Sequence, residues 1–99
     1  MLESSLERSV GNLVKRKNGK YLKLVTPGNT GIPDRLCIFP GGKIVFVELK
    51  RPGLKDGRSP KQKKWAAVLE SLGCRVWRID SLEEMGLKLD ELGLKEERR

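Results

Sequence analysis

Two carboxylates and one ammonium group lie at the ends of two apolar runs in this sequence. Asp34 comes just before the run at residues 35–39, and Glu48 and Lys50 close the run at residues 43–50. Because side chains alternate along a strand, Glu48 and Lys50 share one face. Carboxylate oxygens, carbonyl oxygens and water are the ligands that Mg²⁺ and Mn²⁺ prefer, so a facing carboxylate pair predicts such a site. The other interpretation is a solvated rim, in which Glu48 and Lys50 form a surface ion pair that contributes little.

Whether the two carboxylates face each other depends on the turn between the runs. Pro40-Gly41-Gly42 is typical of a three-residue hairpin loop with a glycine in the left-handed conformation. That loop pairs the residues on either side of it, and counting outward pairs Asp34 with Glu48. Like charges placed opposite each other destabilise a sheet unless a cation lies between them. A two-residue Gly41-Gly42 turn would instead place Arg35 opposite Glu48.

The composition narrows the available chemistry. The chain contains no histidine, which excludes histidine bases, nucleophiles and metal ligands. Its two cysteines, Cys37 and Cys74, lie far apart and outside any CxxC pair, so a structural zinc site is not expected. Both have apolar neighbours, and we interpret them as buried thiols in a reduced, intracellular protein. An enzyme of this composition works with carboxylates, lysines, hydroxyls and a hard metal ion.

The chain is strongly basic. Lysine and arginine number 21 against 13 aspartate and glutamate, a formal net charge of +8. Such a balance favours a polyanionic partner, because each neutralised phosphate releases condensed counterions, although many small basic domains use their charge for solubility alone. No apolar run approaches membrane-spanning length, and the first residues lack the apolar core of a signal peptide. We therefore expect a cytoplasmic protein without a membrane partner.

Hydrophobic periodicity and end signals predict the elements that position these residues. Ser59-Pro60 followed by Gln62, and Ser81 followed by Glu84, are signals for the start of a helix. The predicted elements are a helix at 2–17, strands at 20–26, 35–39 and 43–50, a helix at 60–72, a strand at 74–79 and a helix beginning at 82. The order α-β-β-β-α-β-α predicts an α/β fold with a mixed central sheet flanked by helices. We expect one domain over residues 1–99, with a frayed tail from residue 91.

The apolar residues of the last two helices carry further expectations. For the helix at 60–72 we expect an inner face of Trp65, Val68, Leu69 and Leu72, with Trp65 in the core. Neither tryptophan lies in a pattern typical of base stacking. In the last helix, Leu87 and Leu94 lie off the main apolar face, so they are either isolated exposed leucines or part of an interface between two copies of the chain.

Three short motifs resemble those of a known family. Gly31-Ile32-Pro33-Asp34-Arg35 is followed by Val47-Glu48-Leu49-Lys50 and then by Gln62. In this order they resemble the PD-(D/E)xK nuclease superfamily, and more closely the stand-alone, phage-type VRR-NUC (virus-type replication-repair nuclease) domains. The resemblance covers roughly residues 2–85, and it implies a restriction-endonuclease-like α-β-β-β-α-β core.

The resemblance also implies roles for the charged residues. Asp34 and Glu48, with the Leu49 carbonyl, would bind Mg²⁺ or Mn²⁺, and Lys50 would orient the attacking water and offset charge on the phosphate. The family's helix carboxylate corresponds to Glu3 or Glu7, of which we favour Glu3. Both are also explained as first-turn acids of a helix. Gln62 is implied at the site as well, although the Ser59 capping box explains it without a substrate.

Basic residues cluster just after the predicted site. As DNA-contacting residues we expect Arg35, Arg51, Lys55, Arg58, Lys61, Lys63 and Lys64. Taken singly, each is more often part of a solvated face. Taken together beside a metal site, they are typical of a surface that follows the nucleic-acid backbone and carries little sequence information.

The resemblance, with which the charge and the predicted metal site agree, implies a metal-dependent, structure-specific DNA endonuclease acting at four-way (Holliday) junctions, as in DNA repair. The resemblance implies no nucleotide cofactor, and it implies a homodimer, because resolving a junction needs two symmetry-related cuts. If the chain is phage-encoded, we expect it in the cytoplasm of the bacterial host. The alternatives are a nicking or restriction-like nuclease acting on ordinary duplex, and a non-catalytic nucleic-acid-binding module.

Overall fold

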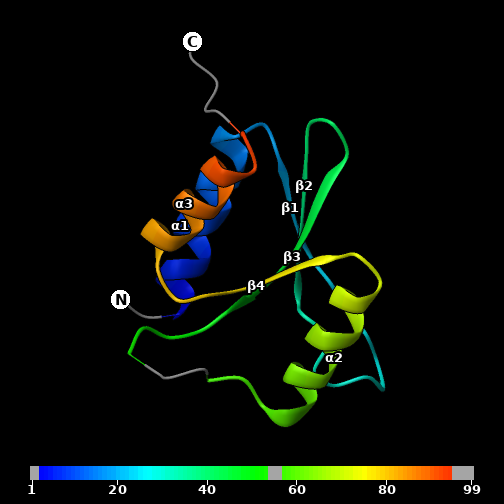
Figure 1. Ribbon diagram of the computed structural model, residues 1–99. Helices are drawn as coiled ribbons and strands as arrows, with labels where there is room; N and C mark the ends of the chain where they lie inside the picture. Colours follow the sequence, from blue (N-terminus) through cyan, green and yellow to red (C-terminus); the bar gives the residue numbers. More distant parts are fainter. Residues whose placement is uncertain (1–2, 54–56, 95–99) are drawn as a thin grey trace.

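The computed structural model describes residues 3–53 and 57–94, and within the first helix it leaves the side chain of Glu3 undescribed. The elements follow the predicted order: α1 (Glu3–Arg16), β1 (Lys20–Lys23), β2 (Arg35–Phe39), β3 (Lys43–Leu49), α2 (Pro60–Ser71), β4 (Arg75–Ile79) and α3 (Leu82–Glu91) (Figure 1). No helix in this part of the chain is long and apolar enough to cross a membrane.

The first strand is shorter than the sequence predicts. It ends at Lys23 instead of continuing to residue 26, because Thr26 begins a turn. The Asn29 N–H donates to the Thr26 carbonyl at 3.1 Å, and the Thr26 hydroxyl donates to the Asn29 carbonyl at 3.1 Å. The backbone groups of Thr26 and Asn29 that bond within this turn are therefore not available to pair with β2.

The four strands form one mixed sheet in the order β1-β2-β3-β4. β1 pairs with β2 and β2 with β3 in antiparallel fashion, whereas β3 and β4 run parallel. In the β2–β3 hairpin Phe39 faces Lys43 and Arg35 faces Val47, so the three-residue loop is confirmed and the two-residue turn does not occur. Gly41 and Gly42 both have positive φ, at 85° and 72°, and a three-residue hairpin loop requires at least one such residue.

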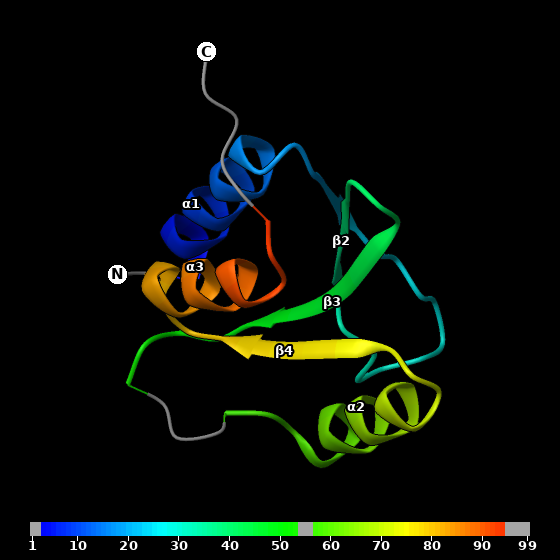
Figure 2. The same cartoon turned by 45° about the horizontal axis from the view of Figure 1, so that its top comes forward.

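The core lies between one face of the sheet and the helices α1 and α3. Figure 2 shows these two helices side by side on one side of the sheet and α2 on the other. Buried apolar side chains from all of these elements form the core: Leu6, Val10, Leu13, Val14, Cys37, Phe39, Val45, Val47, Leu49, Ile79, Met85, Leu89 and Leu94. This face supplies most of the apolar burial, and hence most of the driving force for folding.

The opposite face of the sheet is covered less completely, because α2 lies chiefly against β4. The expected inner face of α2 is wrong in part: the buried residue is Ala66, while Val68 and Leu72 are 39% and 74% exposed. Trp65 is only partly buried and is not a member of the core cluster. A small residue at the contact lets the helix approach the strands closely and turns the larger apolar side chains outward.

The end of α3 is held by a buried lysine that directly follows α1. Lys17 is 7% exposed, and its ammonium group donates to Asp90 at 3.1 Å and to the Leu94 carbonyl at 3.0 Å. Leu94 is itself only 8% exposed. The expectation of a frayed tail is therefore wrong for residues 91–94, and residues 95–99 lie outside the described part. Leu94 belongs to the core and is not free to form an interface, whereas Leu87 is exposed.

The loop before β2 is fixed against α2 at a single glycine. Gly31 has φ +95°, and a Cβ placed there would lie 2.7 Å from the Lys61 carbonyl carbon, which is backbone. Gly28 in the same loop also has positive φ, at +79°, but open space surrounds it. The positive φ favours glycine at both positions. Only at Gly31 would a side chain also collide with the backbone of α2.

These two glycines provide a matched test of the contact between the loop and α2. We expect Gly28→Ala to cost about 1 kcal/mol of unfolding free energy, since the left-handed conformation disfavours a Cβ. Gly31→Ala should cost at least about 1 kcal/mol more, because the methyl group must also displace backbone. Urea unfolding followed by far-ultraviolet circular dichroism measures both values. Equal costs at the two positions would contradict the close packing.

Candidate active site

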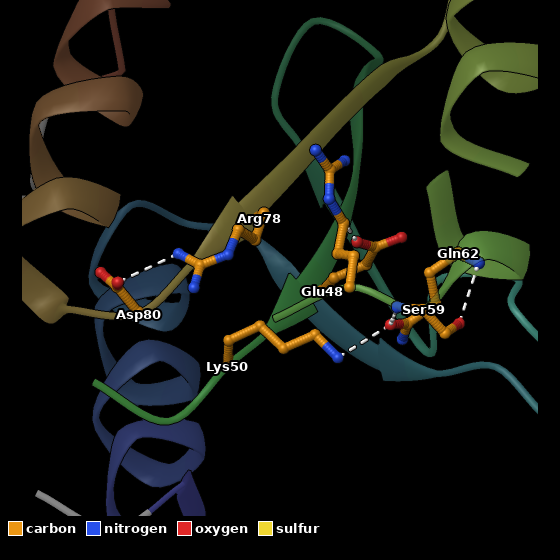
Figure 3. Close-up of polar contacts among 7 residues, drawn as sticks. Glu48, Lys50, Ser59, Gln62, Arg78 and Asp80 are labelled. Carbon is orange, nitrogen blue, oxygen red and sulfur yellow. Dashed lines mark hydrogen bonds and ion pairs between the residues drawn. The ribbon is translucent and has the colours of Figure 1, made fainter. Parts of the chain in front are cut away.

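The charged residues singled out in the sequence gather where the parallel strands β3 and β4 end. Glu48 lies on β3 and pairs in the ladder with Arg78 of β4. Lys50 follows β3, and its backbone N–H donates to the Ile79 carbonyl at 2.8 Å. Figure 3 shows Lys50 reaching toward Gln62 at the start of α2, with Glu48 between them and Arg78, which points toward Asp80. The crossover from β3 through α2 back to β4 therefore assembles the site from three segments.

Glu48 is the most buried charged residue of the described chain, at 2% exposure. An isolated carboxylate in such a position would carry a large desolvation cost. Arg58 offsets part of that cost, because its Nε lies 3.9 Å from Glu48 Oε2. Arg78 is the ladder partner of Glu48 and adds a second positive charge on the same face of the sheet. Arg78 also donates to Asp80 Oδ2 at 3.0 Å. The result is a buried carboxylate set among cationic side chains.

Lys50 is oriented by Gln62, and the same glutamine begins α2. The Lys50 ammonium donates to Gln62 Oε1 at 2.8 Å. The Ser59 N–H donates to this oxygen at 3.0 Å, and the Gln62 N–H donates to Ser59 Oγ at 3.2 Å. The capping box is confirmed, and the same side chain also contacts Lys50, while its role in a reaction stays a prediction. The cap holds the amide in one orientation, and the amide holds the lysine.

Asp34 is placed differently from Glu48. The two residues come next on their strands after the last ladder pair, but the Asp34 side chain is 61% exposed and that of Glu48 only 1%. Asp34 Oδ2 lies 3.5 Å from Nη1 of Arg35. Each carboxylate thus has its own arginine, which relieves the repulsion expected from facing carboxylates.

Arg35, which we expected at the DNA surface, is buried at 7% exposure. Its guanidinium lies 5.8 Å from the centre of the Tyr21 ring and forms an ion pair with Glu7. Burial tends to lower the pKa of Arg35, but the hydrogen bond to Glu7 and the charge of Asp34 raise it above its usual value. Arg35 therefore joins α1 to the start of β2, directly after Asp34, and its burial leaves little of the guanidinium at the surface.

The donor set fits a hard, hydrated metal ion. Among residues 3–53 and 57–94, no three side chains of histidine, cysteine, aspartate or glutamate are close enough to enclose an ion. Mg²⁺ does not need such a cage, because it binds through one or two carboxylates and keeps several of its waters. Asp34 and Glu48 with the Leu49 carbonyl match that chemistry. Of the two candidate helix carboxylates, Glu7 is already paired with Arg35, and the Glu3 side chain lies outside the described residues.

The remaining predicted basic residues divide into three groups. Arg51 is exposed before the gap in the described chain, and Lys61, Lys63 and Lys64 are exposed on the first two turns of α2. Arg58 is partly buried beside Glu48. Lys55 lies outside the described residues. No local signal in the sequence marks Arg78, because only the parallel register of β4 against β3 brings it level with Glu48. Asp80 joins this region through its ion pair with Arg78.

Neither cysteine is placed as a nucleophile. Cys37 is in the core, and burial raises the pKa of its thiol to about 12, so it stays protonated at neutral pH. Cys74 is partly buried just before β4, at the opposite end of that strand from Lys50 and Arg78. The reactive groups near this site are therefore carboxylates, amides and amines, and not thiols.

Comparisons with known proteins agree with this arrangement. A protein described as "Putative nuclease p44", from Acyrthosiphon pisum secondary endosymbiont phage 1, is 43% identical over 79 residues, which is 80% of this chain and 83% of the relative. A solved structure described as a VRR_NUC domain superposes with a TM-score of 0.79 at 29% identity, covering 90% of this chain and 94% of the other. No protein-family model matches the sequence.

The cationic surroundings of Glu48 predict the effect of removing its charge. In metal-free buffer we expect Glu48→Gln to lower the free energy of unfolding by about 1–3 kcal/mol, because Arg58 loses its buried counter-charge and Arg78 loses a ladder neighbour of opposite charge. Glu70→Gln, at an exposed position of α2, should change it by less than about 0.5 kcal/mol. Urea unfolding of both variants provides the measurement. A Glu48→Gln protein as stable as the parent would show that the arginines do not stabilise this carboxylate.

Proposed function

The chain belongs to the VRR-NUC family of nucleases, and on that premise we propose that it is a Mg²⁺- or Mn²⁺-dependent DNA endonuclease acting on branched DNA such as four-way junctions. The observation that carries the proposal is the hydrogen bond from Lys50 to Gln62 beside the buried Glu48. A lysine held in one orientation next to carboxylates suits the hydrolysis of a phosphodiester bond.

Each residue of the site has a distinct task in this mechanism. Asp34, Glu48 and the Leu49 carbonyl would hold the ion, which when bound supplies polarisation of the scissile phosphate and a more acidic water. We assign Glu3 as the helix carboxylate, because Glu7 is paired with Arg35. The products of such hydrolysis carry 5′-phosphate and 3′-hydroxyl ends.

Lys50 and Gln62 act on the reacting groups directly. The Lys50 ammonium has three donor protons, one of which is used by Gln62 Oε1. The others are available to orient the attacking water and to bind a phosphate oxygen as negative charge builds on it. Gln62 keeps the ammonium in place, since its own amide oxygen is also fixed by the Ser59 N–H.

The exposed lysines of α2, together with Arg51 and Lys55, would bind the DNA backbone next to the site. Backbone contacts position the substrate without reading its sequence, which supports recognition by structure. The phage source of the relative supports action in the cytoplasm of a bacterial host, on DNA under replication or repair.

Substitutions at the site test the catalytic assignment. We expect Asp34→Ala, Glu48→Ala and Lys50→Ala each to reduce cleavage by about a hundredfold or more, because each removes a group that acts in the transition state. DNA binding should persist, since phosphate contacts are made elsewhere. Cleavage of junction, flap, duplex and single-stranded DNA with Mg²⁺, Mn²⁺ or EDTA provides the measurement. Glu70→Ala serves as the control, and undiminished cleavage by a folded Lys50→Ala protein would refute the assignment.

We also propose that the active species is a two-fold symmetric homodimer. One chain has one site, whereas a junction needs two cuts with fixed separation and polarity, which a C2 dimer provides. Leu87, 58% exposed on α3, is the remaining candidate at the interface. Sedimentation velocity at micromolar concentration should give twice the 11.2 kDa chain mass, and Leu87→Glu should give the monomer. A strictly monomeric parent protein that still cuts junctions symmetrically would rule out the dimer and leave the nuclease function standing.

A further inference from the structure

A groove lies between α2 and the loop that precedes β2. Its volume is about 340 Å³, and it is lined by Gly28, Asn29, Thr30, Lys61, Lys64, Trp65 and Val68. We call it the α2 groove. The backbone contacts proposed above use Lys61 and Lys64 but do not account for the groove itself or for Trp65 in its wall.

The chemistry of the α2 groove suits a nucleic-acid strand. Its two charged lining residues, Lys61 and Lys64, are both basic, and no acid lines it. Lys61, Lys64, Trp65 and Val68 follow the i, i+3, i+4, i+7 spacing and so form one stripe along the helix. The stripe therefore combines two ammonium groups with one indole ring, which is the combination that binds phosphates and stacks bases.

Trp65 is available for such a contact. The position of α2 that is buried against the sheet is taken by Ala66, at 2% exposure. Trp65 is partly exposed and lines the groove instead of joining the core. The loop wall is held in place, because Gly31 lies in contact with the Lys61 backbone. The groove is thus a formed feature of the fold.

The size and position of the α2 groove indicate that it would bind single-stranded rather than duplex DNA. A volume of 340 Å³ is at the small end of the range of ligand sites, about 300–1,000 Å³, and too small for a duplex. Lys61 directly precedes Gln62, whose amide oxygen accepts from Lys50. Trp65 follows Gln62 by three residues on α2, so the two side chains are neighbours on the helix surface and the groove adjoins the site.

We propose that the α2 groove binds an unpaired DNA nucleotide next to the cut, with its base against Trp65 and its phosphates at Lys61 and Lys64. This inference rests on the nuclease function proposed above and specifies its substrate: branched DNA that has an unpaired nucleotide beside the scissile bond. The groove selects structure because a base within a duplex is already stacked and cannot reach the indole.

Fluorescence in the absence of metal tests the proposal separately from cleavage. The chain has two tryptophans, and Trp77 lies under Lys88, whose ammonium is 5.7 Å from its ring centre. In a Trp77→Phe protein, Trp65 is the sole indole. A short oligothymidylate titrated in EDTA should quench its emission, and a duplex of equal length should not. Absence of quenching by the oligothymidylate, or equal quenching by the duplex, overturns the proposal.

Matched variants test the residues that line the groove. We expect Trp65→Leu, checked for folding by circular dichroism, to weaken oligothymidylate binding about tenfold, as loss of one stacked base predicts. Lys64→Ala should flatten the slope of log affinity against log salt by about 0.7, whereas Arg75→Ala, at the far end of β4, should not. Thr30→Glu should weaken binding through repulsion without altering α2, and Thr30→Gln should not.

The outcomes separate this inference from the proposed function. Unchanged oligothymidylate binding in both Trp65→Leu and Thr30→Glu would overturn the groove assignment, even if the parent protein cuts DNA. Weakened binding in both, with loss of the preference for cutting junctions that carry an unpaired nucleotide, would support it. Failure of the nuclease function would appear instead as cleavage that survives Lys50→Ala.

Discussion

The buried carboxylate of Glu48 is the constraint on which the arrangement of this protein depends. A carboxylate at 2% exposure is tolerated only where cations and hydrogen-bond donors surround it. The parallel strand β4 brings Arg78 to the neighbouring position, and the segment before α2 brings Arg58 to 3.9 Å. Both arginines reach these positions through the crossover from β3 to β4. The topology of the sheet therefore determines which positive charges lie near Glu48.

The two faces of the sheet have different tasks. The face that packs against α1 and α3 holds the apolar core, and Lys17 joins the ends of these helices through Asp90 and the Leu94 carbonyl. The face toward α2 carries Glu48 and makes fewer apolar contacts. Because stability resides mainly on one face, the other can contain charged side chains and exposed apolar residues that a core would not accept.

Gln62 connects local structure with the site. Its backbone and side chain complete the capping box with Ser59, and its amide oxygen also receives the Lys50 ammonium. The interaction that begins α2 therefore also orients the lysine beside the carboxylates. The same contacts therefore stabilise the helix and position the lysine.

Much of the fold was determined by the sequence itself, because its signals act over a few residues. The Pro-Gly-Gly loop set the β2–β3 register, and Ser59 and Ser81 marked the starts of α2 and α3. The motif residues Glu48, Lys50 and Gln62 do meet. Other features were decided only by tertiary structure: the burial of Arg35 beside Glu7, the ladder pairing of Arg78 with Glu48, the place of Trp65 in the wall of the α2 groove and the burial of Leu94. Each of these depends on how a strand or helix packs against a segment distant in the chain, and neither periodicity nor turn chemistry contains that information.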